Sequence, residues 1–517
     1  MMLTFVVLLA VGATAHPSCR YSEWDAWTQC TPNALCQSQR TQSLESYTSK
    51  TVSGVYQDQG RMNGEAMMEH KKRLWAGPNP LRTARESITG AAVDCTGGYA
   101  SGFRCQNVNL QSFLSLQDLA GSGNTDGPSE RGNDLWGWTD PTNNDEYVIM
   151  GLDDGTSFVR ITDPVNPVVV AFLPTATVPS QWRDMKVVND HAYIVSEAVG
   201  HGMQVFDLTR LRGQTDMGDV EVDFHYTEIG NTHNIVSNPA SNTVFLVGST
   251  DDSQACLAGL HMVDVSSPKN PLFAGCYWED GYTHDAQCHI YNGPDTDYVG
   301  REICYNYNED QLTIVDVTSK ANPVTISTSG YPLATYTHQG WITEDHTMIL
   351  LDDELDERDT FLDGNTVTYL WDVRDLDNPV IVGDYTAAHE AIDHNQYIRG
   401  SRVYQANYEV GLRILEIDQA TPSLTEIGYF DVDDTSTGGT MEFQGAWTGY
   451  PYFASGNVPV SSIGYGLFIV RPDSMAMTET YQAGLNGTEQ RERQLVAGDP
   501  SSCVAVKETR YCKASCH

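Results

Sequence analysis

The chain repeats one short segment, seen most clearly in His261-Met-Val-Asp-Val265, Leu312-Thr-Ile-Val-Asp-Val317, Tyr369-Leu-Trp-Asp-Val373 and Leu412-Arg-Ile-Leu-Glu-Ile417. Each copy has the apolar, β-branched character of a strand and carries an acidic residue near its end. An Asn-Pro turn follows most copies. Weaker copies are Gln204-Val-Phe-Asp-Leu208, Phe158-Val-Arg-Ile161 and Leu467-Phe-Ile-Val470. The seven copies predict seven repeats of one structural unit.

An anchor residue lies upstream of each copy, and successive anchors are 47 to 56 residues apart. The anchors are Trp136, Arg183, His233, His284, His338, His394 and Gln444. This period is too long for most helical repeats and is typical of four strands per unit. No helical apolar periodicity crosses the strands. Because one small sheet cannot bury its own faces, the sequence predicts an all-β fold, a seven-bladed β-propeller.

The closure of the ring can also be predicted. The last unit has no clear final strand after Arg471-Pro472, whereas residues 107–114 resemble the fourth strand of the first unit, residues 166–173. We expect residues 107–114 to complete the seventh blade. A ring closed in this way by an N-terminal strand leaves no free sheet edge.

The N-terminus predicts secretion. Residues 1–15 combine an uncharged apolar run with Ala13-Thr-Ala15, a typical cleavage pattern, so we interpret them as a signal peptide. No other apolar stretch is long enough to span a membrane. The formal net charge of −38 argues against nucleic-acid partners, because contacts to phosphate need lysine or arginine. We expect a secreted protein, extracellular or associated with the cell surface.

Twelve cysteines, an even number, fit an oxidising compartment. Six lie inside the chain as near neighbours, for which we predict the pairs Cys95–Cys105, Cys256–Cys276 and Cys288–Cys304. The other six lie at the chain ends: Cys19, Cys30, Cys36, Cys503, Cys512 and Cys516.

Several longer motifs resemble those of a known family. They are Asp134-Leu-Trp-Gly-Trp-Thr-Asp-Pro141, Trp182-Arg-Asp-Met-Lys-Val187, residues 192–208, Tyr282-Thr-His-Asp-Ala-Gln-Cys288 and Tyr336-Thr-His-Gln-Gly-Trp341. From about Cys95 to Val470 the chain is similar to the LVIVD-repeat propellers of the choice-of-anchor B family. Members are secreted or surface-attached, and their biochemical role is poorly defined. The resemblance therefore supports the fold more than the function.

The two chain ends together resemble a thrombospondin type-1 repeat. Residues 19–30, with Trp24 and Trp27, look like its opening, and residues 503–516 look like its closing half. The resemblance implies one module split by insertion of the propeller, and such an insertion has a low loop-closure cost. It also implies the pairs Cys19–Cys503, Cys30–Cys512 and Cys36–Cys516, and stacking of the two tryptophans with Arg40.

The spacing from Cys30 to Cys36 is longer than is usual in that repeat, so the fucosylation motif of many members is absent. An unrelated disulfide knot at the termini is the alternative. Trp24 and Trp27 are candidate glycosylation sites, as is Asn486 in the sequon Asn486-Gly-Thr488.

These observations give five segments. They are residues 1–15 as signal peptide, 16–45 as the first half of the module, 46–94 as a connector, 95–475 as the propeller, and 476–517 as a linker with the second half. In the connector, Gly60 to Trp75 contains a Lys-Lys-Arg run. We interpret it as a short helix or linker with a solvated basic face.

Four anchors are histidines in consecutive repeats: His233, His284, His338 and His394. The start of each innermost strand of a propeller lines the mouth of the central channel, so the four imidazoles should converge there. Converging imidazoles suit a divalent metal ion, Zn²⁺, Mn²⁺ or Fe²⁺. Their neighbours Asn234, Asp285, Gln339 and Asn395 are candidates to fix the tautomers. The alternative is that the histidines only join blades by hydrogen bonds.

The loops between second and third strands should open on the same face and give it an acidic rim that attracts cations, with carboxylates suited to Ca²⁺. The rim acids are Asp153, Asp154, Glu197, Asp251, Asp252, Glu309, Asp310, Asp352, Asp353, Glu354 and Glu409. Aromatic residues predicted near this mouth can stack on sugar rings or belong to the core: Trp136, Trp138, Trp341, Tyr305, Tyr307 and Tyr408. Arg183 and Asp184 are interpreted as a salt bridge rather than a catalytic pair.

Two function classes remain open. The first is a binding or adhesion protein that holds an extracellular protein or glycan, with a divalent metal as a candidate cofactor. Its candidate ligand-binding residues are Arg183, Asp184, Glu197, Asp285, Asp353, Trp136 and Trp341. The second is a metal-dependent lyase or hydrolase acting on extracellular polysaccharide, with the histidines holding the ion. No nucleophile, phosphate-loop or zinc-protease motif occurs, and binding is the preferred interpretation.

Overall fold

A computed structural model describes residues 20–21, 64–81, 84–120, 129–250, 256–332, 334–358, 364–434, 440–477, 487–493, 495–497 and 506–512. The chain forms two compact units. The smaller consists of residues 1–47 and 479–517, and the larger of residues 48–478.

The larger unit is built from seven antiparallel sheets. The first is β5 (Gly132–Thr139), β6 (Glu146–Leu152), β7 (Gly155–Arg160) and β8 (Val168–Pro174), and the second is β9 (Arg183–Val188), β10 (His191–Ser196), β11 (Met203–Asp207) and β12 (Phe224–Tyr226). The third is β13 (Asn234–Asn238), β14 (Thr243–Val247), β15 (Leu260–Asp264) and β16 (Leu272–Tyr277). The fourth is β17 (Asp285–Ile290), β18 (Glu302–Tyr307), β19 (Gln311–Asp316) and β20 (Val324–Gly330).

The remaining three sheets complete the ring. The fifth is β21 (Thr337–Ile342), β22 (Met348–Asp353), β23 (Asn365–Asp372) and β24 (Val380–Glu390). The sixth is β25 (Gln396–Arg399), β26 (Arg402–Ala406), β27 (Leu412–Asp418) and β28 (Ser423–Phe430), extended at its outer edge by β3 (Phe103–Gln106) and β2 (Tyr99–Ala100). The seventh is β29 (Ala446–Gly449), β30 (Val458–Ser462), β31 (Gly466–Pro472) and β4 (Val108–Ser115).

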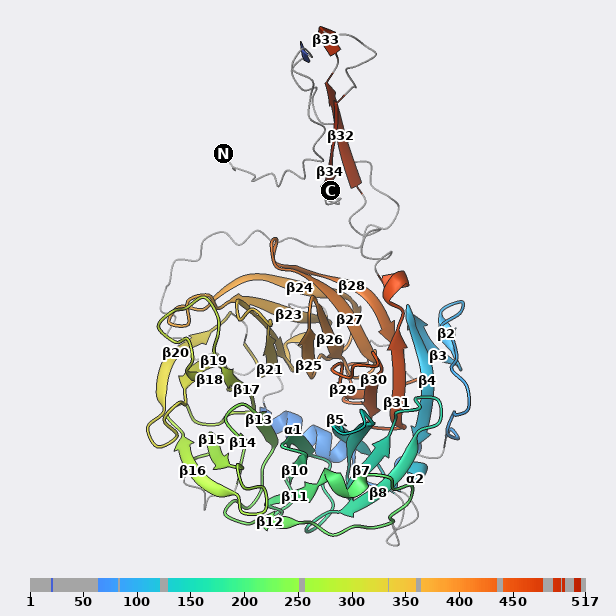
Figure 1. Cartoon of the computed structure of the whole chain (residues 1–517), viewed down its shortest axis with the longest axis vertical. Coiled ribbons are helices and arrows are strands. Elements are labelled where there is room, and N and C mark those ends of the chain that lie inside the picture. The colour runs from blue at the N-terminus through green and yellow to red at the C-terminus, as the bar shows by residue number, and fades with distance from the viewer. Residues whose placement is uncertain are drawn as a thin grey trace. The chain divides into compact units, whose positions relative to one another are not determined.

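The seven sheets are arranged in a ring around a central axis, as Figure 1 shows. The first strand of each sheet contacts the first strand of the next, and β29 of the seventh contacts β5 of the first. The seventh sheet takes its fourth strand from the N-terminal side of the ring, because β4 pairs antiparallel with β31 along its whole length. The predicted all-β, seven-bladed propeller is therefore the fold of this unit.

The repeated sequence segment is the third strand of each sheet. In six sheets the pairing of this strand with the fourth shifts by one residue, for example between Met262 and Val263 or Ile314 and Val315. Such bulges increase the local twist of a strand. The sequence repeat thus marks a repeated geometric feature as well as a repeated strand.

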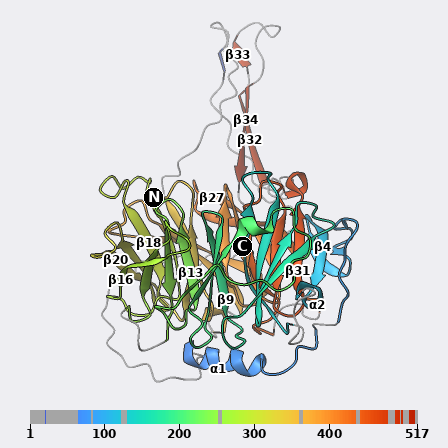
Figure 2. The ribbon, with the colours of Figure 1, turned by 60° about the horizontal axis from the view of Figure 1, so that its bottom comes forward.

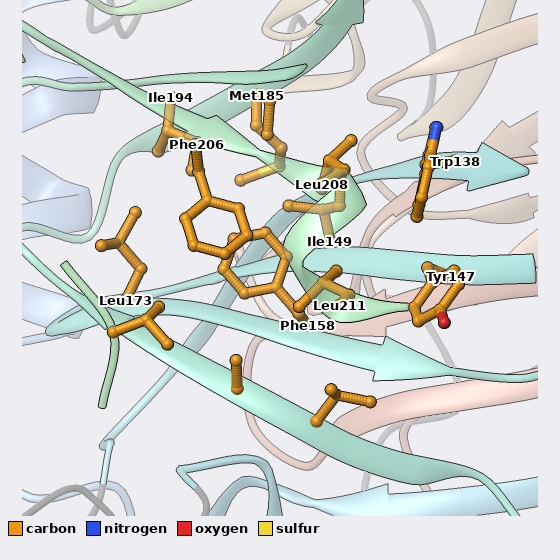
Figure 3. Close-up of a cluster of buried hydrophobic side chains, with 14 residues drawn as sticks. Trp138, Tyr147, Ile149, Phe158, Leu173, Met185, Ile194, Phe206, Leu208 and Leu211 are labelled. Carbon is orange, nitrogen blue, oxygen red and sulfur yellow. The ribbon is translucent and has the colours of Figure 1, made fainter. Parts of the chain in front are cut away.

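The core lies between neighbouring sheets. Between the first and second sheets, Phe158 and Phe206 face each other with ring centroids 4.6 Å apart (Figure 3). Around them pack Trp138, Tyr147, Ile149, Leu173, Met185, Ile194, Leu208 and Leu211. Burial of these side chains on both sheet faces stabilises the ring, because each side chain removes apolar area from water.

The three predicted inner disulfides are present. Cys288 and Cys304 are directly paired across β17 and β18, and Cys95–Cys105 closes the hairpin that extends the sixth sheet. Cys256–Cys276 links the loop before β15 to β16. These bonds fit the oxidising compartment expected from the cysteine count.

Helices that accompany the strands in the described part of the chain include α1 (Gly64–Leu74), α2 (Leu116–Leu119), η1 (Leu208–Leu211) and η2 (Asp356–Arg358). Figure 2 shows α1 lying across one end of the propeller. Within the described residues, no helix has the length and apolar character to cross a membrane.

The smaller unit contains two short strand pairs. β1 (Arg20–Tyr21) pairs with β33 (Leu495–Ala497), and β32 (Gly487–Arg493) pairs with β34 (Val506–Cys512). Each predicted terminal disulfide involves a cysteine outside the described residues, and Trp24, Trp27, Arg40 and Asn486 lie outside them as well. The thrombospondin-like module therefore stays a prediction.

Candidate functional site

Four imidazoles lie side by side at the channel end that α1 covers. Neighbouring ring centroids are 4.5 Å apart for His233 and His284, 4.4 Å for His284 and His338, and 4.5 Å for His338 and His394. Each side chain comes from the start of an innermost strand or from the residues just before it. We call this group, with Glu354 and Lys71, the histidine end.

The Nδ1 atoms of the histidines are already engaged. His284 Nδ1 donates to the carbonyl oxygen of His338 at 2.9 Å, and His394 Nδ1 donates to that of Trp447 at 2.6 Å. His338 Nδ1 lies 3.0 Å from Asp352 Oδ1. A carbonyl accepts only, so Nδ1 carries the proton and Nε2 keeps its lone pair. This arrangement is the usual one for metal-binding histidines.

Glu354 lies between two of these Nε2 atoms. It follows β22, and its Oε2 and Oε1 are 3.9 Å from His338 Nε2 and 3.8 Å from His394 Nε2. Ligand atoms of the three residues all lie within 4.8 Å of one another. Bonds of about 2.0–2.2 Å from a central Zn²⁺ would span such separations. The three residues form a group that can hold a metal ion.

Burial controls the protonation of this group. It lowers the pKa of His284 and His338 well below the usual range, and lowers that of His394 to about 4. The imidazoles are therefore neutral at neutral pH, which is the form that binds a metal. Two imidazoles and a carboxylate suit Zn²⁺, Mn²⁺ or Fe²⁺ better than Ca²⁺.

Helix α1 places a cation of its own in the site. Lys71 Nζ donates to Glu354 Oε1 at 2.5 Å, and the Tyr408 hydroxyl donates to the same oxygen at 2.5 Å. Lys71 is 3% exposed, and burial lowers its pKa although Glu354 opposes the shift. Glu354 Oε2 has no hydrogen-bond partner. Oε1 of this carboxylate thus accepts two hydrogen bonds, whereas Oε2 accepts none and could bind a metal ion.

The interpretation of this stretch as a solvated basic face is wrong for Lys71, although Lys72 and Arg73 are exposed. Met67 and Trp75 pack beside Trp447 in the core cluster below the channel, which anchors the helix. Trp75 Nε1 also donates to the Phe443 carbonyl at 3.1 Å. No sequence pattern indicated that this lysine faces inward, since a strongly charged run usually lies on a solvated face.

The predicted partners of the histidines are different residues in the structure. His233 Nδ1 pairs with Glu197 Oε1 at 2.6 Å, so the rim acid Glu197 does reach a histidine. Asn234 and Gln339 donate instead to the backbone carbonyls of His284 and Gln396. Asn395 lies 3.5 Å from Asp134, and Asp285 accepts from the Ala286 amide. The second-strand loops and backbone carbonyls therefore orient the imidazoles.

The predicted salt bridge between Arg183 and Asp184 does not form. Arg183 donates to the Leu152 carbonyl at 2.9 Å and to Thr175 at 2.7 Å, and it contacts His201. Alternate residues of a strand face opposite sides, and the arginine points into the sheet interface.

Asp353 is also a structural residue, because it accepts from the Tyr331 hydroxyl and the amides of Thr335 and Tyr336.

Three carboxylates and a lysine lie next along the channel-facing strands: Asp134, Asp184, Asp285 and Lys186, here called the acid layer. Lys186 Nζ bonds to Asp184 Oδ1 at 2.7 Å. Burial raises the pKa of Asp134 well above its usual range, with repulsion from Asp184 adding to the effect, and raises that of Asp285 to about 7. The layer has three acidic side chains and one lysine, and burial favours the protonated form of Asp134; a cationic guest would favour the ionised carboxylate and compete with that proton.

An aromatic layer adjoins the acid layer and consists of Trp136, Trp341, Tyr397, Tyr450 and Tyr452. Trp136 contacts Tyr397 at 5.6 Å and Tyr450 at 5.1 Å between ring centroids, and Trp341 contacts Tyr397 at 4.8 Å. Lys186 Nζ lies 4.7 Å from the Trp136 ring, which is a cation–π contact. The two tryptophans, Tyr450 and Tyr452 are half-buried.

The structure thus divides the predicted site residues between two places. The four histidines and Glu197 are at the histidine end, whereas Trp136, Trp341, Asp184 and Asp285 are in the acid and aromatic layers. Tyr408 belongs with the histidines, and Trp138, Tyr305 and Tyr307 belong to the core. The sequence analysis missed Lys71, Trp447, Lys186 and Asp134. Lys186 and Asp134 could have been found, because they stand two residues from Asp184 and Trp136 on the same strand faces.

No family model matches the chain, and no curated protein matches it either. The resemblance to LVIVD-repeat propellers therefore stays a prediction.

Solved structures that are similar to the chain include the following three. The β-propeller domain of Cps50 (Swd1) from Myceliophteria thermophila has 10% identity and a TM-score of 0.42 over 63% of this chain and 93% of its own. The periplasmic gluconolactonase PpgL of Pseudomonas aeruginosa has 13% identity and a TM-score of 0.41 over 59% and 88%. A protein from Lactobacillus plantarum has 13% identity and a TM-score of 0.40 over 74% and 100%.

Proposed function

We propose that this chain is a secreted extracellular binding protein that holds a glycan in the acid and aromatic layers of the propeller channel. The observation that carries the proposal is the set of half-buried rings beside an excess of carboxylates. Trp136 and Trp341 keep part of their surface exposed although they line the inner strands. Aromatic faces stack on sugar rings, and carboxylates favour neutral or amine-bearing sugars over acidic ones.

The histidine end supports this proposal as a structural site. His338, Glu354 and His394 are 1%, 0% and 3% exposed, with α1 above them. A catalytic metal site keeps an open position for water and substrate, whereas a structural site is closed. The enclosure therefore favours a structural cation over a metal-dependent lyase or hydrolase acting on a polymer.

The experiment is calorimetric titration of the purified secreted protein with short glucosamine oligomers, glucose oligomers and galacturonate oligomers. We expect the glucosamine oligomers to bind most tightly, because their ammonium groups meet Asp134, Asp184 and Asp285. Trp136→Ala and Trp341→Ala should each weaken binding by about tenfold, which corresponds to about 1.4 kcal/mol.

Trp278→Ala is the matched control. This tryptophan follows β16, the outermost strand of the third sheet, and is 44% exposed. Binding should be unchanged in this variant. Equal loss in all three variants, or tightest binding of the galacturonate oligomers, would contradict a glycan site in these layers.

A further inference from the structure

A cavity of about 570 Å³ lies between the sixth and seventh sheets, on the face opposite the histidine end. His394 comes just before β25 and donates to the Trp447 carbonyl in β29, so both strands begin at the histidine end. Because neighbouring strands are antiparallel, the turn from β25 to β26, the loop from β29 to β30 and the end of β31 all reach the opposite face. Residues of these segments line the cavity: Arg399, Gly400, Ser401, Arg402, Tyr404, Pro451, Ser455, Gly456, Val458, Arg471, Pro472 and Ser474.

The lining of this arginine cavity is positively charged. It contains Arg399, Arg402 and Arg471, and none of the residues that line it is acidic. The whole chain has 68 acidic residues and only 30 lysines and arginines, so a basic lining runs against the composition of the protein. Arg399 and Arg402 are half-buried and Arg471 is exposed, which leaves all three within reach of a ligand from solvent.

Neutral acceptors hold two of the three guanidinium groups in place. Arg399 Nη1 donates to the carbonyl oxygens of Pro451 and Phe453, the second at 2.9 Å, and so joins the sixth sheet to the seventh. Arg471 Nε donates to Asn457 Oδ1 at 3.0 Å. These bonds fix the direction of each side chain but leave its positive charge without a counter-ion. Since a guanidinium has five N–H donors, each one keeps donors for a ligand.

Arg402 differs from the other two arginines because it has an acidic partner. Its Nε donates to Glu416 Oε2 at 3.1 Å, on the neighbouring strand β27. Within the part of the chain that the structure describes, no ion pair joins Arg399 or Arg471 to a carboxylate. The cavity therefore has two positive charges that the protein itself does not pair.

Two further acids contact the segments that line the cavity. Glu146 accepts from the amide of Ser455 at 3.1 Å and from its hydroxyl at 2.6 Å, and Glu344 accepts from the Gly400 amide at 2.9 Å. Neither carboxylate lines the cavity. Both are held by donors of the surrounding loops, so they fix these loops and leave the cavity surface basic.

We infer that the arginine cavity binds a monosaccharide that carries a sulfate or phosphate ester. Such an ester offers three terminal oxygens and can accept from guanidinium groups of three different segments, whereas a carboxylate offers two oxygens and suits a single arginine. Ligand pockets measure about 300–1,000 Å³, so the volume suits a small organic molecule better than a free ion. Serine hydroxyls and the apolar side chains of Pro451, Val458 and Pro472 in the lining match the hydroxyls and the apolar face of a sugar ring. This site is independent of the proposed glycan site in the acid and aromatic layers.

The test is calorimetric titration of the full-length protein with glucose 6-sulfate and with glucose 6-phosphate, beside glucose and inorganic sulfate. At least one ester should bind at least about tenfold more tightly than glucose or inorganic sulfate, because only the esters combine the oxyanion with the ring. The ester that binds more tightly identifies which oxyanion the cavity takes. Added salt should weaken ester binding, since the arginines are open to solvent.

Variants locate the bound ester. Arg402→Gln and Arg471→Gln should each weaken its binding by about tenfold, because each removes a charge-assisted hydrogen bond. Arg471 is exposed, so its replacement should leave the melting temperature unchanged. Arg374→Gln is the matched control: it removes the same charge from an exposed pair with Asp372 and should leave ester binding unchanged. Trp136→Ala should also leave it unchanged, which separates this site from the proposed glycan site.

The inference is overturned if neither ester binds more tightly than glucose, or if inorganic sulfate binds as tightly as the esters, which would indicate a site for a free anion. It is also overturned if Arg402→Gln and Arg471→Gln keep the wild-type affinity, or if Arg374→Gln weakens binding equally. Loss of ester binding in Trp136→Ala would place the ester in the aromatic layer and would overturn the inference as well.

Discussion

The histidine end and the aromatic layer both lie along the innermost strands of the ring but differ in how far their side chains are buried. At the histidine end every ring is buried, α1 covers the opening, and a protein lysine supplies positive charge to Glu354. In the aromatic layer four of the five rings are half-buried, and in the adjoining acid layer Lys186 pairs with only one of the three acidic side chains. One propeller can therefore bury its inner side chains completely at one level and leave them partly exposed at the next.

The largest expected effect is on Glu354. Glu354→Ala leaves Lys71 buried without its counter-ion and removes the acceptor of the Tyr408 hydroxyl. Loss of one partner from a buried ion pair costs about 3–5 kcal/mol. We expect that decrease in the free energy of unfolding, measured by denaturant titration. In the control Glu69→Ala, the exposed Lys72–Glu69 pair is lost and the cost should be below about 1 kcal/mol. An equal decrease in the free energy of unfolding in both variants would mean that the buried Lys71–Glu354 pair is no more important for stability than an exposed one.

The next largest effect is expected on metal binding, and it tests which histidines can hold a metal ion. The double variant His338→Ala with His394→Ala should lose about one equivalent of transition metal, measured by elemental analysis of the purified protein. His233→Ala should keep it, because His233 pairs with Glu197 and is outside the group whose ligand atoms lie within 4.8 Å.

Lys71→Met tests metal binding at the same group from the side of Glu354. The ammonium competes with a metal ion for Glu354, so its removal should increase zinc affinity by about tenfold or more. Unchanged affinity would show that Lys71 and the ion do not share this carboxylate. Metal retained in the double variant would remove the histidine end as the metal site.

The smallest effect is a pH dependence of the acid layer. Asp134 faces Asp184, Lys186 and Asp285, and its pKa is raised in the folded protein. The folded state therefore holds a proton that the unfolded state releases above about pH 4, so this residue makes stability fall as pH rises from there. Asp134→Asn should remove that fall between pH 4 and 7, measured as the difference from wild type by denaturant titration. An identical pH profile in the variant would show that Asp134 is ionised in the fold.

Much of the fold could be predicted because each repeat is formed by residues that are close together in the sequence. The third-strand segment and the anchor spacing specify four strands per unit, and the three inner disulfides join near neighbours in sequence. The approach of the four histidines followed from their equivalent places in consecutive repeats. The disulfides and stacking expected for the terminal module involve residues outside the described part of the chain.

The site could be predicted only in part, because its remaining residues come from outside the repeat. Lys71 precedes the propeller and reaches Glu354 across 283 residues. Trp447 orients His394 through its backbone carbonyl, and a pattern of side chains in the sequence cannot reveal a backbone contact. Arg183 occupies a histidine-equivalent anchor, yet its longer side chain finds acceptors within the sheet interface. Repetition predicts where a position lies, whereas unique long-range contacts decide what it touches.

The pairing of β4 with β31 sets a constraint on how the protein is made. About 350 residues separate the end of β4 from the start of β31. At about 5–20 residues per second, a ribosome needs roughly 20 to 70 seconds to synthesise that interval. During this time β4 has left the ribosome and its partner does not exist. The growing chain must keep this apolar strand from pairing with the wrong edge until nearly the whole propeller has been translated.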